Sequence, residues 1–78
     1  MEQITRKQVQ LIGSAQTFEE LEKLIKERMY WKEVHIEESD RYEAHWGKVY
    51  DVSNAKGRLD GTLIIKPNNG RWGIYYIK

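Results

Sequence analysis

The chain has no cysteine, a single proline and no long apolar run, and each absence excludes a class of protein. Without cysteine, no disulfide bond can stabilise the fold, and a reducing compartment suits such a chain. No stretch approaches the ~18 apolar residues that a membrane-spanning helix needs. Residues 1–13 are too polar for a secretory signal peptide. We therefore expect a cytoplasmic protein with no membrane partner.

Catalytic and cofactor-binding motifs are also missing. The sequence contains no glycine-rich phosphate loop, no nucleophile elbow and no helical pair of zinc-binding histidines. Ser14, Ser39 and Ser53 lie in turn-like stretches, and none has an evident base as a neighbour. We therefore expect neither an enzyme nor a cofactor.

Length and charge set two further limits. A chain of 78 residues is enough for one domain, which buries only roughly 60% of the surface exposed when unfolded. Little apolar material is then left to line a deep substrate cavity. Residues 1–40 hold nine acidic and six basic residues, whereas residues 41–78 hold three and seven. This asymmetry is a weak indication of a basic surface on the second half.

One helix is clearly indicated over residues 18–30. Thr17 suits the N-cap, and Glu20 stands three residues later, which is the spacing of a capping box. Acidic residues crowd the first turn and basic residues the last, as the helix dipole favours. Apolar residues recur on one face, at Phe18, Leu21, Leu24, Ile25 and Met29.

The segment before this helix allows two structures. Thr5 and Gln8 have the spacing of a second capping box, and Gly13 could end a short helix. The alternation of Val9 and Leu11 instead fits a strand. We predict the short helix on the capping pattern.

From residue 31 onward the apolar residues alternate with a period of two, which is typical of strands. Strand-like segments cover residues 34–37, 42–52, 59–66 and 71–78. Consecutive strands joined by short polar turns pair as an antiparallel meander. The predicted fold class is α+β: one main helix, with the short helix before it, packed on an antiparallel sheet of about four strands in a meander. It forms a single domain over residues 1–78.

The first predicted hairpin carries the one cluster that could hold chemistry. A three-residue loop at residues 38–40 pairs Ile36 with Tyr42 and keeps the apolar side chains on one face. The other face then gathers His35, Glu43 and His45, residue types that bind divalent metals or act as general acid and base. A solvated sheet face with cross-strand charge pairs is the simpler interpretation. We predict no bound metal and keep the metal or acid–base site as a second alternative.

The last predicted hairpin turns at residues 69–70, because Asn-Gly is a strong signal for a two-residue turn. This turn pairs Ile65 with Ile74 and Leu63 with Tyr76. These four side chains then form a face that belongs to the core.

Protein–protein contact is the function that we expect. Trp, Tyr and Arg are the usual anchors of interfaces, and the chain has three Trp and five Tyr. The second face of the last hairpin carries Ile64, Tyr75 and Ile77, which residues 4–12, a second copy or a partner must cover. We predict a small non-enzymatic binding or regulatory protein, either a monomer or a homodimer. Its contact residues would be Trp72, Tyr75, Ile77 and Ile64.

Nucleic-acid binding is the first alternative. Five basic residues of the second half are interleaved with aromatic residues: Lys48, Lys56, Arg58, Lys66 and Arg71. Aromatic platforms beside basic residues bind single strands by base stacking and phosphate contact. Against this, a domain of this size needs most of its aromatic side chains to fill the core.

Overall fold

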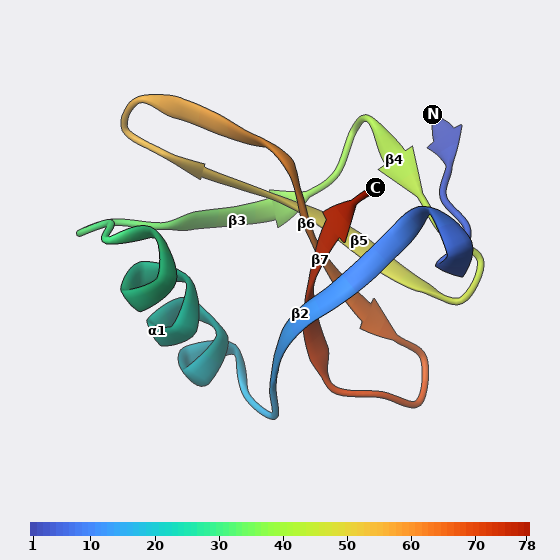
Figure 1. Ribbon diagram of the computed structural model, residues 1–78, viewed down its shortest axis with the longest axis horizontal. Helices are drawn as coiled ribbons and strands as arrows, with labels where there is room; N and C mark the ends of the chain where they lie inside the picture. Colours follow the sequence, from blue (N-terminus) through green and yellow to red (C-terminus); the bar gives the residue numbers. More distant parts are fainter.

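Five strands form the main sheet, and two short strands pair beside it (Figure 1). The computed structural model describes residues 1–78, apart from the side chain of Asp60. The elements are β1 (Glu2–Gln3), the 3-10 helix η1 (Arg6–Gln8), β2 (Val9–Ala15), α1 (Phe18–Met29), β3 (His35–Glu38), β4 (Tyr42–Glu43), β5 (Gly47–Asn54), β6 (Gly57–Pro67) and β7 (Trp72–Ile77). The main sheet has the order β2-β7-β6-β5-β3 and is antiparallel throughout, whereas β1 and β4 are parallel. The α+β class is confirmed, but the sheet has more than the predicted four strands.

Helix α1 forms where the sequence predicts it. The hydroxyl of Thr17 accepts a hydrogen bond from the backbone N–H of Glu20 at 3.1 Å. The Glu20 carboxylate reaches back to accept one from the N–H of Gln16 at 3.1 Å, so the capping box closes one residue before the N-cap. Leu21 and Ile25 are fully buried against the sheet. Within the described part of the chain, no helix is long and apolar enough to cross a membrane.

The predicted short helix is wrong beyond its first turn. The backbone N–H of Thr5 donates to the side chain of Gln8 at 2.8 Å, but only the three residues of η1 follow this cap. The chain then extends as β2 and pairs with β7. A single 3-10 turn contributes few hydrogen bonds, whereas pairing with β7 satisfies the backbone groups on one side of a seven-residue strand and buries Val9 and Ala15.

The first predicted hairpin is also wrong. Strand β3 pairs with β5, so that Ile36 lies opposite Val52 rather than Tyr42. The residues between these strands leave the main sheet, and Tyr42–Glu43 forms β4 beside β1 instead. The backbone N–H of Ile4 donates to the carbonyl of Glu43 at 2.8 Å, which fixes this excursion against the N-terminal segment.

The last hairpin forms with a register one residue away from the predicted one. Leu63 lies opposite Tyr75, and Ile64 lies opposite Ile74. The turn differs from the predicted Asn69-Gly70 pair. The N–H of Gly70 donates to the carbonyl of Pro67 at 3.2 Å, which centres the turn on Asn68 and Asn69, and β7 begins only at Trp72. Since successive side chains of a strand point to opposite faces, this shift exchanges the predicted faces of β7 relative to β6.

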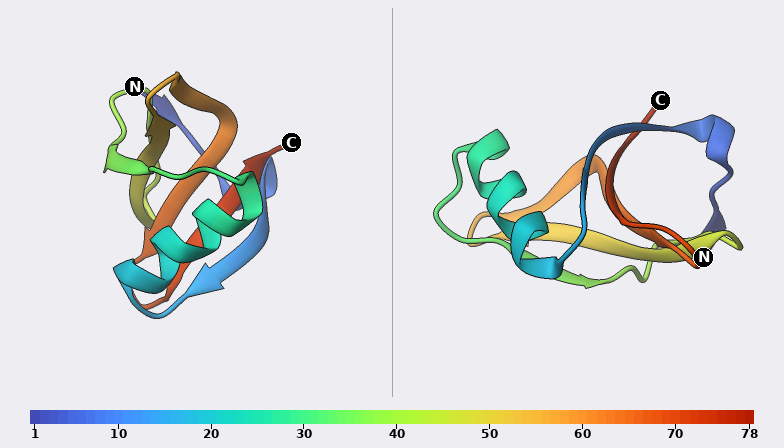
Figure 2. Two further views of the ribbon diagram at one scale, coloured as in Figure 1. Left: turned by 90° about the vertical axis from the view of Figure 1, so that its left-hand side faces the viewer. Right: turned by 90° about the horizontal axis from the view of Figure 1, so that it is seen from below.

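The sheet is buried on both sides (Figure 2). Under α1 lies a core made of Ala15, Leu21, Ile25, Val52, Ile64 and Ile74. On the other side lies a second core made of Ile4, Val9, Trp46, Val49, Leu63 and Ile65. Tyr75 and Ile77 pack against this second core. The chain therefore covers its second sheet face with its own N-terminal segment.

Gly47 marks the place where β5 begins close to the end of β6. A Cβ atom at this position would lie 2.8 Å from the carbonyl oxygen of Lys66 and 2.8 Å from Cα of Pro67. Both neighbours are backbone atoms that cannot rotate away. The register shift of β5 lies further on, between Asp51 and Ser53, so Gly47 permits a close approach of two strands.

We expect Gly47→Ala to lower the free energy of unfolding by about 1–3 kcal/mol, because the added methyl group forces the two strands apart. Gly13→Ala is the matched control, since its Cβ would meet only the side chain of Ile74, at 3.5 Å. Denaturant unfolding followed by tryptophan fluorescence measures both variants. Equal stability of the two would contradict this role of Gly47.

Candidate functional site

The structure does not assemble the predicted cluster of His35, Glu43 and His45. His35 lies on β3 opposite β5, and its Nε2 is 3.0 Å from Oε1 of the exposed Glu33. The carboxylate of Glu43 accepts a hydrogen bond from Gln3 at 2.6 Å. Among the described residues, no three His, Cys, Asp or Glu side chains come close enough together to hold a metal ion. The hairpin that was predicted to join the three residues does not form.

The four predicted contact residues lie in three different environments. Trp72 is half-buried and belongs to the side of the sheet that α1 covers. Tyr75 and Ile77 are half-buried on the opposite side, because alternate residues of β7 face opposite ways. Ile64 is fully buried beneath α1. One flat partner surface cannot contact Trp72 and Tyr75 together.

Trp72 is the centre of a surface at the N-terminal end of α1. We call it the Trp72 surface, and it consists of Phe18, Lys48, Tyr50, Lys66 and Trp72. The ring of Phe18 meets Trp72 edge-on at 5.5 Å between centroids, and the ring of Tyr50 lies 5.3 Å from it. The ammonium group of Lys66 lies 5.0 Å from the centre of the Trp72 ring, within the range of a cation–π contact.

Two lysines of the Trp72 surface face each other across the strands. Lys48 and Lys66 are directly paired in the β5–β6 ladder, and both are exposed. Like charges in this position destabilise a sheet. Lys48 Nζ lies 3.6 Å from a carboxylate oxygen of Glu38, but both side chains are more than half exposed, so this pair contributes little. The surface therefore has a positive character that the fold does not require.

The other predicted basic residues do not join this surface. Lys56 and Arg58 lie at the far end of the β5–β6 hairpin, near the pair formed by Ser53 and Arg58. Arg58 Nη1 lies 3.5 Å from Asp40 and 3.8 Å from the buried Asp51. Lys48 and Lys66 thus lie at one end of the β5–β6 hairpin and Lys56 and Arg58 at the other, whereas Arg71 lies in the turn before β7. Arg58 takes part in ion pairs within the chain.

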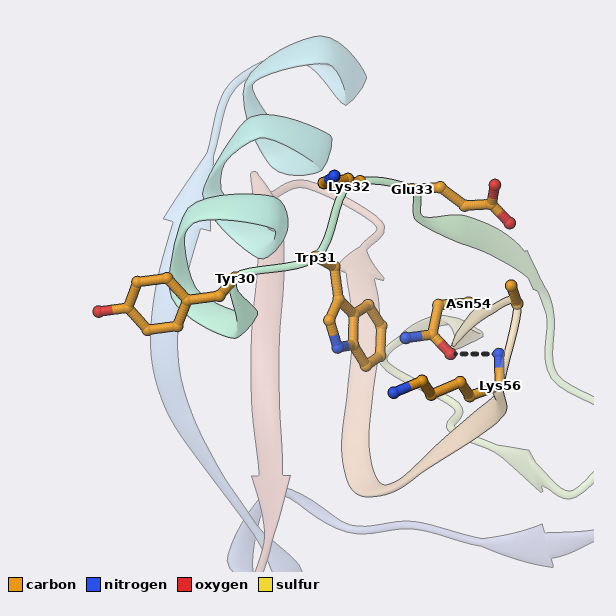
Figure 3. A pocket seen from close by; sticks show the side chains of 7 residues that line it. Tyr30, Trp31, Lys32, Glu33, Asn54 and Lys56 are labelled. Carbon is orange, nitrogen blue, oxygen red and sulfur yellow. Dashed lines mark hydrogen bonds between the residues drawn. The ribbon is translucent and has the colours of Figure 1, made fainter.

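A hollow of about 380 Å³ lies between the end of α1 and the β5–β6 hairpin (Figure 3). The indole of Trp31 extends towards Asn54 and Lys56, and the backbone N–H of Lys56 donates to the Asn54 side chain at 2.9 Å. Lys32 lies on the rim of the hollow. The ring of Tyr30 points away from it into solvent and is 93% exposed. The hollow combines one aromatic wall with basic, acidic and amide groups.

Tyr30 was not recognised in the sequence as a residue of interest. It ends α1 in the left-handed conformation, with φ 56° and ψ 35°, and its N–H donates to the carbonyl of Lys26. Helices commonly end on glycine or asparagine here, since other residues are strained in this conformation. The sequence has no glycine or asparagine where this helix ends, and this indicates that another residue must adopt the left-handed conformation.

Comparison with protein-family models, with curated proteins and with solved structures finds no match to this chain. The chemistry of the surface is therefore the basis for a functional inference. Exposed or half-buried aromatic rings beside lysines can bind a ligand through ring contact and charge. The arrangement favours recognition.

We expect Tyr30→Gly to raise the free energy of unfolding by about 1 kcal/mol, because glycine adopts the left-handed conformation without strain. The exposed ring loses no packing in this change. Thermal or denaturant unfolding measures the effect. Tyr30→Ala is the control, since it removes the ring but keeps the strained Cβ. If it raised the free energy of unfolding as much as Tyr30→Gly does, strain would not be the cause.

Proposed function

We propose that this chain is a small non-enzymatic binding protein that acts through contacts with another protein. The observation that carries the proposal is the Trp72 surface, where three aromatic rings and two opposed lysines gather beside the N-terminal end of α1. Tryptophan and tyrosine dominate the energetics of protein interfaces, because they bury a large area at small entropic cost.

The charges of this surface point to the character of the partner. Lys48 and Lys66 repel each other in the free protein, and a carboxylate placed between them would relieve that repulsion. Arg71, exposed and directly before Trp72 in the chain, is a third positive charge close to this surface in sequence. An acidic segment with an apolar side chain for the Trp72 ring fits this surface best.

Tyr75 and Ile77 define a second contact area in this proposal, on the opposite side of the sheet. Both remain half-buried beside the second core, so part of each side chain is accessible. Ile64 is fully buried, and its contribution is to hold β6 in place beneath α1.

Trp72→Ala should weaken binding of a captured partner by about 2 kcal/mol or more, which is roughly thirtyfold, as expected for an interface anchor. Lys66→Glu should weaken it about tenfold, since it reverses the charge that meets the partner. The tagged protein is used to isolate the partner from lysate of its source cells, with nuclease and added salt, and affinities are then measured by calorimetry.

The matched controls for this experiment are His35→Ala and His45→Ala, which change exposed side chains outside both contact areas. They should bind as the unchanged protein does. Circular dichroism verifies that each variant is folded. Tyr75→Ala is measured beside these four variants, and equal affinity of all five would sink the proposal. A loss confined to Tyr75→Ala would instead transfer the contact to the opposite side of the sheet.

Single-stranded nucleic acid is the second candidate, and the opposed lysines beside the aromatic rings favour it. Lys48, Lys66 and Arg71 could contact phosphates while Trp72 or Tyr50 stacks on a base. The nucleic acid would bind the same surface as the protein partner. The two candidates are therefore distinguished by the ligand that binds and by how its affinity depends on salt.

Fluorescence anisotropy with labelled single-stranded RNA and DNA tests this candidate across a salt series. Three phosphate contacts predict that the logarithm of affinity falls with that of salt concentration with a slope of about −2. Lys66→Glu should make this slope smaller, and Lys56→Glu, at the other end of the hairpin, should leave it unchanged. Affinity that does not vary with salt excludes this mode.

A further inference from the structure

Strand β2 forms one edge of the main sheet, and its outer side has no strand partner within the described chain. In Figure 2 (left) it runs along the margin of the molecule beside α1. Lys78 donates its N–H to the carbonyl of Gln8, so Gln8 faces β7 and, by alternation, the backbone groups of Leu11 point outward. Leu11 itself is 54% exposed. An edge of this kind offers hydrogen-bonding groups to another strand.

The composition of β2 lacks the usual protection of a free edge. Its seven residues include no charge and no proline, although one bulge lies between Leu11 and Gly13. The opposite edge, β3, is shorter and carries Glu37 and Glu38. Two copies paired through β3 would place like charges together, whereas two copies paired through β2 would not.

A groove of about 320 Å³ runs beside this edge, between β2 and α1. Its lining includes Ile12 and Gly13 from β2 and Leu24 from α1, and Leu24 is 37% exposed. A strand added to β2 would lie about 4.8 Å from it, with alternate side chains directed towards the helix side. An apolar side chain of the added strand would therefore enter this groove.

We propose that a second copy of this chain occupies the edge, with the two β2 strands antiparallel about a two-fold axis near Ile12. A two-fold interface requires a surface that complements itself. The uncharged strand meets this condition, and so does the rim of the groove, where Glu27 and Arg28 stand side by side. Neither forms an ion pair with a described residue of its own chain. The two-fold axis brings Glu27 of one copy towards Arg28 of the other.

This dimer does not depend on the proposed function. The Trp72 surface and the β2 edge consist of different residues, so partner binding and self-association can each fail without the other.

Sedimentation velocity from about 10 µM to about 1 mM covers the range in which a weak dimer forms. The mass should rise from monomer to dimer, and the amide of Leu11 should gain protection from hydrogen exchange with concentration. Leu11→Lys should raise the dissociation constant about tenfold or more, because it places two positive charges at the paired edge. Glu37→Lys, on the other edge strand, is the control and should leave the dimer unchanged.

A charge exchange identifies the occupant as a second copy. Glu27→Arg makes the rim wholly positive and Arg28→Glu makes it wholly negative, so each variant alone should dimerise more weakly than the unchanged protein. An equal mixture of the two should dimerise again, since each then meets the opposite charge.

Two results would overturn the dimer. One is a monomer at every concentration, in which case the edge is left for an extended segment of another protein. The other is a dimer with two properties: Leu11→Lys does not weaken it, and the amides that gain protection from hydrogen exchange with concentration lie outside residues 10–14. Circular dichroism and thermal unfolding establish that every variant is folded, so that loss of the dimer is not confused with loss of the fold.

Discussion

The ladder between β2 and β7 is the contact on which the rest of this structure depends. It joins Val9–Ala15 to Trp72–Ile77, the two ends of the chain. Because β2 leads directly into α1, its position places the helix over one side of the sheet. The residues just before β2 then reach the other side, where Ile4 is buried with Trp46. One pairing thus supplies cover for both apolar faces of a small sheet.

The places where the chain departs from local preferences coincide with its accessible aromatic and basic groups. Lys48 and Lys66 are two like charges placed directly opposite each other in the β5–β6 ladder, where neutral residues would be more stable. Tyr30 adopts a strained conformation while its ring contributes no packing. Departures of this kind are expected where a surface serves recognition, because stability there is exchanged for function. The part-buried ion pair of Asp51 with Arg41, at 3.0 Å, involves neither of these groups and joins the segment that leads to β4 to strand β5.

Two kinds of surface therefore lie on one small scaffold. The Trp72 surface is aromatic and positive, and it suits a partner that differs from this chain. The β2 edge is uncharged and complements itself, which suits a second copy. Trp72 lies opposite Ala15 at the end of β2, so the two surfaces are adjacent in the sheet although they share no residue. A dimer through β2 would present two Trp72 surfaces in a fixed arrangement, and two linked sites bind a repeated partner more tightly than one.

The sequence by itself determined the helix and the presence of most strands. Thr17, Glu20 and the helical spacing of Leu21 and Ile25 are local signals, and local hydrogen bonds satisfy them. Long runs with a period of two likewise indicated β5, β6 and β7. The α+β class follows from these elements.

Tertiary structure decided which strands pair, and in which register. In β6 and β7 both faces are apolar, so a slip of one residue exposes nothing polar to the core, and alternation could not choose between Ile65 and Ile64 as the partner of Ile74. The N-terminal strand had no local advantage over a helix, because its hydrogen bonds are made only to β7 at the other end of the chain. The same holds for the candidate site: Phe18, Tyr50 and Trp72 are far apart in sequence, and only the folded sheet brings their rings together.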